Sequence, residues 1–255
     1  MRPRLFTALA AGLLLVFTVT GRSPADEAAP YPEFVAEYDA SVNGIGIGTV
    51  KVTLKHKSDG SYLYRQESES SGLVSLFAAA DSVETSHWQL RDGHIAPLEY
   101  QSTRKGGDDD DNEHLLYNWV THKVKNVGAG PHWEIDLPED TLDRLVMQLA
   151  ILFDLRDGAT QLDYRIPRQG KLKEYRFALV GEEDIELTSG VYRTLKVART
   201  NDDNDKNLVW SAPELDYFPV RFLKHKKSGL KITLALSKLD FAPFGEASSA
   251  LEVAP

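Results

Sequence analysis

The stretch WSAPELDYFPVRF, residues 210–222, holds the side chains of this sequence best suited to contact an apolar ligand. The candidate residues are Trp210, Tyr217, Phe218, Arg221 and Phe222. Four aromatic rings could line a groove, while one guanidinium could meet a ligand head group or the carboxylate of Asp216. No catalytic acid, base or nucleophile is evident among these residues.

The two prolines of this stretch favour a structural corner over the mouth of a site. Pro213 favours a turn after the strand that ends at Trp210. Pro219 has no N–H to donate, so it belongs at the start of a strand or at a sheet edge. We therefore expect a corner, with an apolar groove as the alternative.

Two acidic segments could hold calcium, namely GGDDDDNEH at 106–114 and NDDNDK at 201–206. Neither has the ligand spacing of a helix–loop–helix calcium site. We expect solvated hairpin tips, and ion binding by residues 107–113 or 201–205 stays an open alternative.

The remaining chemical motifs are missing from the sequence. GIGIG at 44–48 lacks the spacing of a dinucleotide-binding loop, so its glycines more plausibly mark a bend or a close backbone approach. The seven histidines form no HxH, HxxxH or HExxH pair, and no GxSxG is present. We predict no cofactor, no metal site and no enzymatic activity; a hydrolase with a non-contiguous site is the remaining enzymatic alternative.

The first 25 residues resemble a cleavable export signal. Arg2 and Arg4 precede an apolar run over residues 5–20, and small residues follow at 23–25. An uncleaved anchor is the alternative, but this run is shorter than the roughly 20 residues that a span needs. We predict cleavage after Ala25, a linker at 26–33, a periplasmic location and no stable membrane span in the mature chain.

Charge and cysteine content narrow the classes of partner. The net charge is −9, and removing residues 1–25 removes three arginines, which gives −9 − 3 = −12. Nucleic acid and anionic membrane surfaces repel such a chain, so neither is an expected partner. The chain has no cysteine, hence neither a disulfide nor a cysteine for acylation.

Most of the chain has the alternating pattern of half-buried strands. Such segments lie at 50–55, 61–70, 83–90, 94–104, 113–120, 121–127, 174–180, 191–200, 208–210 and 230–241. In the last segment, Leu239 and Phe241 are out of phase with Leu236. This change of phase predicts a β-bulge between Leu236 and Leu239. About a dozen strands in meander order are expected.

One segment, residues 139–158, instead has apolar residues at helical spacing. Asp140 or Thr141 could cap its start and Gly158 could end it. Residues 72–80 are either a short helix or a loop. The predicted fold is mainly β: a single strongly curved antiparallel sheet, an open barrel or β-spiral, packed around one long helix. It spans residues 34–241 and leaves a flexible tail at 242–255.

The order of several segments resembles the family called domain of unknown function 3108. The segments are YDASVNGIGIGTVKVTL, PLEY, EDTLDRLVMQLAILFDLRDG, VGEEDIELTSGVYRTLKVART and WSAPELDYFPVRF. The resemblance implies an exported, mostly β protein whose sheet curls around a helix, similar to lipoprotein carriers. It implies no catalytic residues.

Two functions fit these observations. The first is a non-enzymatic envelope protein that binds an apolar ligand, such as a lipid or acyl chain, or supports envelope integrity. The alternative is a structural protein with a filled core that acts through an envelope protein partner. Apolar alternation does not distinguish an open interior from a filled one, and a filled interior is the commoner arrangement.

Overall fold

The computed structural model describes residues 31–70, 81–105, 112–202 and 204–242. The predicted signal peptide, most of the linker, the 72–80 stretch, most of the first acidic loop and nearly all of the tail lie outside these residues. Within them the first strand begins at Phe34 and the last ends at Phe241.

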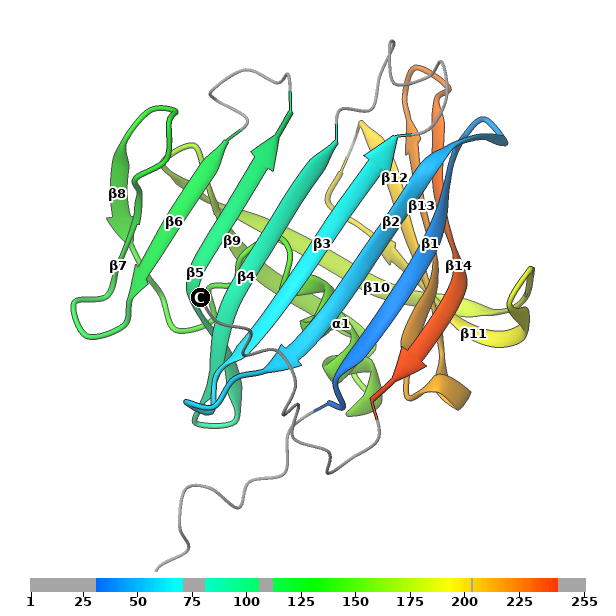
Figure 1. Cartoon of the computed structure of the whole chain (residues 1–255), viewed down its shortest axis with the longest axis horizontal. Helices are drawn as coiled ribbons and strands as arrows, with labels where there is room; N and C mark the ends of the chain where they lie inside the picture. The colour runs from blue at the N-terminus through cyan, green and yellow to red at the C-terminus, as the bar shows by residue number, and fades with distance from the viewer. Residues whose placement is uncertain (1–30, 71–80, 106–111, 203, 243–255) are drawn as a thin grey trace, which may run out of the picture. The chain divides into compact units, whose positions relative to one another are not determined.

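In the described parts of the chain, fourteen strands form one antiparallel sheet, which confirms the mainly β class and the single antiparallel sheet (Figure 1). The first eight are β1 (Phe34–Val42), β2 (Ile45–His56), β3 (Tyr62–Ser70), β4 (Ser82–Arg91), β5 (His94–Arg104), β6 (Glu113–Asn118), β7 (Lys123–Asn126) and β8 (Trp133–Asp136). The others are β9 (Gln161–Arg168), β10 (Lys171–Leu187), β11 (Gly190–Arg199), β12 (Asp205–Ala212), β13 (Phe218–Lys226) and β14 (Lys231–Phe241).

The sheet consists of two meanders that meet at the first and last strands. Its order is β8-β7-β6-β5-β4-β3-β2-β1-β14-β13-β12-β11-β10-β9. Strands β8 and β9 are the two edges and do not pair, so the sheet is open. We call β1–β8 the N-terminal half and β9–β14 the C-terminal half.

The two edges nevertheless approach each other at one point. A Cβ on Gly170, in the β9–β10 turn, would lie 3.5 Å from the Cβ of Trp133 in β8. A flat sheet of this many strands would be about 60 Å wide, from a strand spacing of roughly 4.8 Å. The sheet is therefore not flat, while the strong curvature along its whole width stays a prediction.

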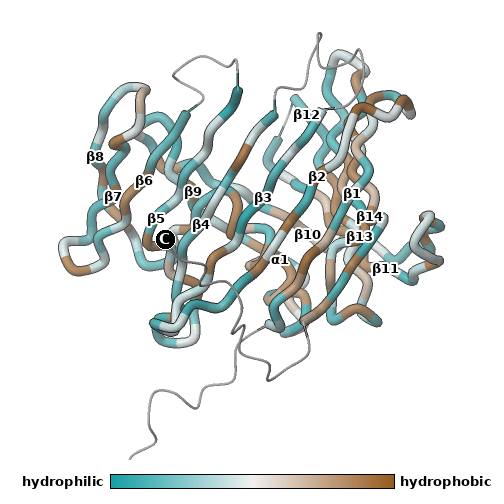
Figure 2. Tube along the Cα trace, viewed as in Figure 1, coloured by the Kyte–Doolittle hydropathy of each residue, from teal (hydrophilic) through white to brown (hydrophobic). Residues whose placement is uncertain are grey.

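The sequence pattern located the strand irregularities. Tyr38 pairs with Leu236 and Glu37 with Lys238, so Ser237 is the extra residue of a bulge in β14, as predicted. A Cβ on Gly48 would overlap the backbone of Glu69 in β3, which is the close approach expected of this glycine. Hydrophobic residues recur along the strands between hydrophilic ones (Figure 2).

The prediction of one long helix over 139–158 was wrong. The helix α1 spans only Met147–Arg156, ten residues. The start of the segment pairs with the sheet instead: Thr141 forms a parallel bridge with Arg165 of β9, and the Leu142 N–H donates to the Arg165 carbonyl at 3.0 Å. Backbone bonds to an exposed strand edge therefore replace the expected first turns.

The residue that stabilises the turn before α1 is also not the predicted one. The Asp143 carboxylate accepts the backbone N–H groups of Leu145 and Val146, both at 2.8 Å. Such bonds satisfy donors that a helix start leaves free. At the other end, Gly158 has φ 86° and donates its N–H to the Leu155 carbonyl at 3.0 Å. We call residues 141–156 the helix segment.

Candidate functional site

A partly buried polar network attaches the helix segment to the N-terminal half of the sheet. The Ser86 hydroxyl of β4 donates to Asp143. Arg144 donates to Glu84 at 3.0 Å and to Ser102 at 3.1 Å, and the Tyr100 hydroxyl donates to Glu84 at 2.7 Å. Charge-assisted bonds of this kind fix both position and orientation.

Asp143 is the most strongly buried carboxyl group of this network, with 1% of its surface exposed. Burial raises its pKa from 3.8 to about 7, although the bonds from Ser86, Val146 and Leu145 act in the opposite direction. Desolvation disfavours the charged form, and here it outweighs the hydrogen bonds. This carboxyl therefore titrates near neutral pH.

On its other side, the helix segment leaves a cavity of about 350 Å³ against the C-terminal half of the sheet. The lining residues are Arg144, Met147, Gln148, Ile151, Arg168, Tyr175, Phe177, Arg199, Asn207, Leu208, Val209, Phe222, Leu223, Lys224, Ile232 and Leu234. This volume lies at the small end of the range of about 300–1,000 Å³ seen for ligand sites. The cavity is our candidate functional site.

Strand register explains why the sheet wall of this cavity is apolar. Val209 of β12 pairs with Phe222 of β13, which pairs with Leu234 of β14. Paired residues share a face of the sheet, and alternate residues along a strand return to that face. Ile232 and Phe177 extend the same wall. Phe222, Ile232 and Leu234 are only half-buried, so their apolar surface is available to a ligand.

Cations are the charged groups of the lining. They are Arg144, Arg168, Arg199 and Lys224, and no Asp or Glu lines the cavity within the described residues. Lys224 and Arg168 are exposed, whereas Ile151, Phe177 and Val209 are buried. The cavity thus passes from a cationic mouth to an apolar interior.

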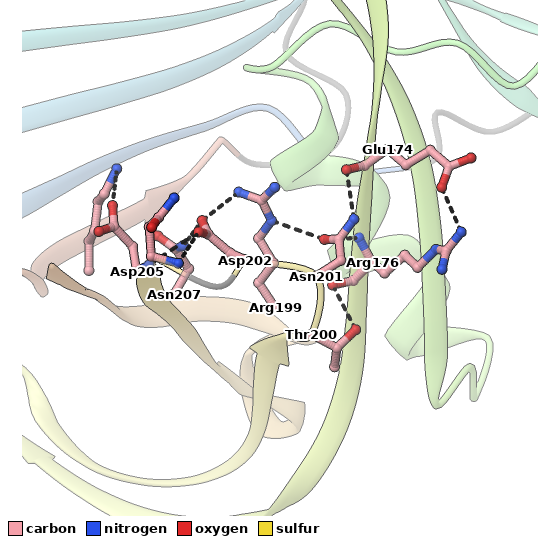
Figure 3. Close-up of polar contacts among 10 residues, drawn as sticks. Glu174, Arg176, Arg199, Thr200, Asn201, Asp202, Asp205 and Asn207 are labelled. Carbon is pink, nitrogen blue, oxygen red and sulfur yellow. Dashed lines mark hydrogen bonds and ion pairs between the residues drawn. The ribbon is translucent and has the colours of Figure 1, made fainter. Parts of the chain in front are cut away.

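The second acidic loop holds two of these cations in place (Figure 3). Arg199 donates from Nη1 to Asp202 at 2.9 Å and from Nε to Asn201 at 3.2 Å. Lys224 lies 3.1 Å from Asp205. Asn207 also donates to Asp202, at 3.1 Å. The carboxylates of Asp202 and Asp205 therefore pair with side chains of the protein.

The local environment keeps Asp202 charged. Desolvation is the largest single influence on its pKa and raises it, but the bonds from the backbone N–H groups of Asp205 and Asn204 and the charges of Arg199 and Lys224 together hold the pKa below its usual range. Among the described residues, no three His, Asp or Glu side chains are grouped so that they could hold a metal ion.

The structure separates the residues singled out in the sequence. Phe222 lines the cavity. Trp210 and Arg221 pair on the opposite face of β12 and β13, where the Trp210 indole donates to Glu183 at 3.0 Å and the Arg221 guanidinium lies 5.2 Å from its ring. The carboxylate of Asp216 lies 3.5 Å from Arg156. Only one of the five candidates therefore contacts the cavity.

Tyr217 and Phe218 belong to the connection between β12 and β13. A 3-10 helix, η4 (Pro213–Leu215), is followed by Asp216 and Tyr217 with φ 54° and 61°. Phe218 is buried and packs edge-on against Phe34, with ring centroids 5.0 Å apart. These residues turn the chain and fill the core beside β1.

Sequence reasoning missed most of the cavity. Phe177, Ile232 and Leu234 belong to strands whose alternation is evident in the sequence. The sequence does not show, however, that the helix segment lies opposite the wall that they form. Arg199 and Lys224 carried no sequence signal except their position on the same strand faces. The acidic loop was noticed for its carboxylates rather than for the cations that these carboxylates position.

None of the helices in the described parts of the chain has the length and apolar character needed to cross a bilayer.

Comparison with known structures shows the fold. A β-barrel-like protein of the DUF1849 family from Brucella abortus superimposes with a TM-score of 0.50 at 9% identity, over 83% of this chain and 98% of that one. A structure of MucB gives a TM-score of 0.35 at 14% identity, over 85% of this chain and 56% of that one. No curated protein sequence matches the chain.

A family model matches most of the chain. It covers residues 37–235, from the first strand to the last, and thus includes the helix segment and every lining residue of the cavity. The chain belongs to the family described as protein of unknown function DUF3108.

Proposed function

We propose that this protein is an exported, non-enzymatic component of the cell envelope that holds an apolar ligand, such as a lipid or an acyl chain, in the cavity beside α1. The observation that carries the proposal is the cavity itself. Its sheet wall is built from apolar side chains, and three of them, Phe222, Ile232 and Leu234, remain half-buried.

The energetics favour occupation of this space. Phe222, Ile232 and Leu234 keep apolar surface that a ligand would remove from water. Burial of apolar surface is worth about 25 cal/mol per Å², so covering the exposed apolar surface of the cavity contributes about 2 kcal/mol, and the buried surface of the ligand chain adds to this. The buried residues Ile151 and Phe177 extend the apolar contact inward.

Export is supported by the N-terminal pattern of two arginines, an apolar run and small residues at 23–25. The acidic composition and the absence of cysteine fit a mature chain that stays in solution without acylation. A periplasmic carrier or an envelope scaffold would both use such a chain, and the cavity favours the carrier.

Native mass spectrometry of residues 26–255, purified from a periplasmic extract without detergent, tests this proposal. We expect extra mass that organic extraction removes. Leu234→Trp should fill the cavity and abolish the extra mass, whereas Val191→Trp, at an exposed position outside the lining, should retain it. A bare mass, together with no uptake of an added acyl chain, would favour the filled-core interaction protein instead.

A further inference from the structure

We propose that the ligand is a single-chain anionic amphiphile whose head group lies between Arg199, Lys224 and Arg168, an inference that rests on the proposed function. The head group is a carboxylate or a phosphate monoester, because both offer several acceptor oxygens to these donors. The chain of the amphiphile lies along the wall formed by Phe222 and Leu234.

The charge of the cavity lining is opposite in sign to the net charge of the chain. The whole chain carries −9, yet the charged residues that line this cavity are all cations. A local reversal of charge inside an acidic protein attracts anions and excludes cationic ligands. A neutral lipid would leave the cations at the mouth without a partner in the ligand.

The carboxylates that hold two of these cations also lie outside the cavity. Asp202 and Asp205 hold Arg199 and Lys224 from outside the lining, and neither carboxylate belongs to the cavity wall. Arg199 donates from Nη1 to Asp202 and from Nε to Asn201, and its Nη2 takes part in none of the hydrogen bonds of the described residues. Arg168 likewise makes no ion pair within the described part of the chain. Donors therefore remain for a ligand.

The guanidinium of Arg199 is also held rigidly. It lies over the ring of Tyr175 with its central carbon 4.1 Å from the ring centroid. Tyr175 itself lines the cavity. A donor fixed by stacking and by an ion pair loses little conformational freedom when an anion binds, which favours affinity.

The size of the cavity limits the ligand to one chain. About 350 Å³ is near the lower limit for small-molecule sites. The exposed cations lie at the mouth and the buried Ile151 lies in the interior, so head group and chain have defined places. A two-chain phospholipid would have to leave one chain in water.

Isothermal titration of the mature protein with three twelve-carbon probes tests this inference. The probes are dodecanoate, dodecyl phosphate and dodecanol, each below its aggregation limit. We expect both anions to bind at least tenfold more tightly than the alcohol, with an affinity that falls as salt is added. The tighter of the two anions identifies the head group.

Two pairs of substitutions test whether the cations at the mouth of the cavity cause the tighter binding of the anions. Arg168→Gln combined with Lys224→Gln should weaken both anions at least tenfold and leave dodecanol within twofold. The matched control, Arg193→Gln with Lys55→Gln, removes the same charge from exposed residues outside the lining and should change neither. Equal binding of dodecanol and the anions would overturn the anionic head group and leave the proposed function standing. If no probe binds, both proposals fail.

Discussion

The two sides of the helix segment differ in how they meet the sheet. Toward β4 and β5 the segment is attached through Asp143, which accepts a hydrogen bond from Ser86, and through Arg144, which donates to Glu84 and to Ser102. Toward β10–β14 it faces apolar side chains across a cavity. Because the helix segment is firmly attached to β4 and β5, the space between it and β10–β14 can stay unfilled.

The physical reason is that a buried polar network specifies geometry in a way that apolar contacts do not. Arg144 and Asp143 have few arrangements that satisfy their bonds, so the segment cannot shift toward the C-terminal half without leaving charged groups unpaired. Apolar residues alone would allow the helix to collapse onto the facing wall. The network thus maintains the cavity.

The first expected effect is a difference in the free energy of unfolding lost by two leucine truncations. Leu145→Ala removes a side chain with 0% exposure from the attached part of the segment and should lower the free energy of unfolding by about 3 kcal/mol. Leu234→Ala, in the half-buried cavity wall, should cost less than about 1 kcal/mol. Urea denaturation measures both, and equal costs would contradict the distinction between the two sides.

The second expected effect is a pH dependence of the free energy of unfolding, which arises from Asp143 on the side of the helix segment that faces β4 and β5. Because the pKa of Asp143 rises from 3.8 to about 7 on folding, the folded protein keeps a proton that the unfolded chain loses. This group therefore makes stability fall as pH rises from about 4 to about 7, and the loss is complete above that range.

Asp143→Asn should remove this loss, since an amide oxygen still accepts the N–H groups of Leu145 and Val146. Since a rise from 3.8 to about 7 is about 3 pKa units, we expect the variant to be more stable than the wild type by up to about 4 kcal/mol at pH 8 and to have no such advantage at pH 4. Denaturation curves at both pH values measure the difference. A constant difference between the two proteins would show that Asp143 does not titrate in this range.

The smallest effect concerns a single hydroxyl of the network. Tyr100→Phe removes the 2.7 Å bond to Glu84 and should cost about 1.5 kcal/mol, as expected for a bond to a charged acceptor. The control, Tyr192→Phe, removes a 3.0 Å bond to the Ser189 carbonyl far from the helix segment and should cost about 0.5 kcal/mol. Thermal unfolding ranks the two, and a larger loss in the control would weaken the case for the network.

The local parts of the fold were predictable from sequence. The period of two located β4 and β5 to within a residue or two, and the loss of phase after Leu236 located the bulge at Ser237. Gly48 marked a close backbone approach. Each of these features depends on neighbouring residues in the chain, which is the information that a sequence pattern contains.

The features that the sequence did not predict correctly depend on contacts between distant segments of the chain. Apolar spacing over 139–158 predicted one helix, but Leu142 bonds to the edge strand β9 and only Met147–Arg156 is helical. The cavity was not predictable because alternation shows which face of a strand is apolar and not what lies opposite that face. The cations at its mouth come from β9, β11 and β13, and the second acidic loop binds two of them.

Pairing of the first strand with the last has a consequence for the order of folding. Phe34 pairs with Phe241, so the central strand pair of the sheet joins the two ends of the domain. This contact is among the most distant in the chain, and contacts of high sequence separation form slowly. The sheet cannot be completed until β14 has been synthesised, and until then β1 and β13 each present an unpaired edge. A chain truncated before β14 would keep both edges exposed and would therefore be prone to aggregate.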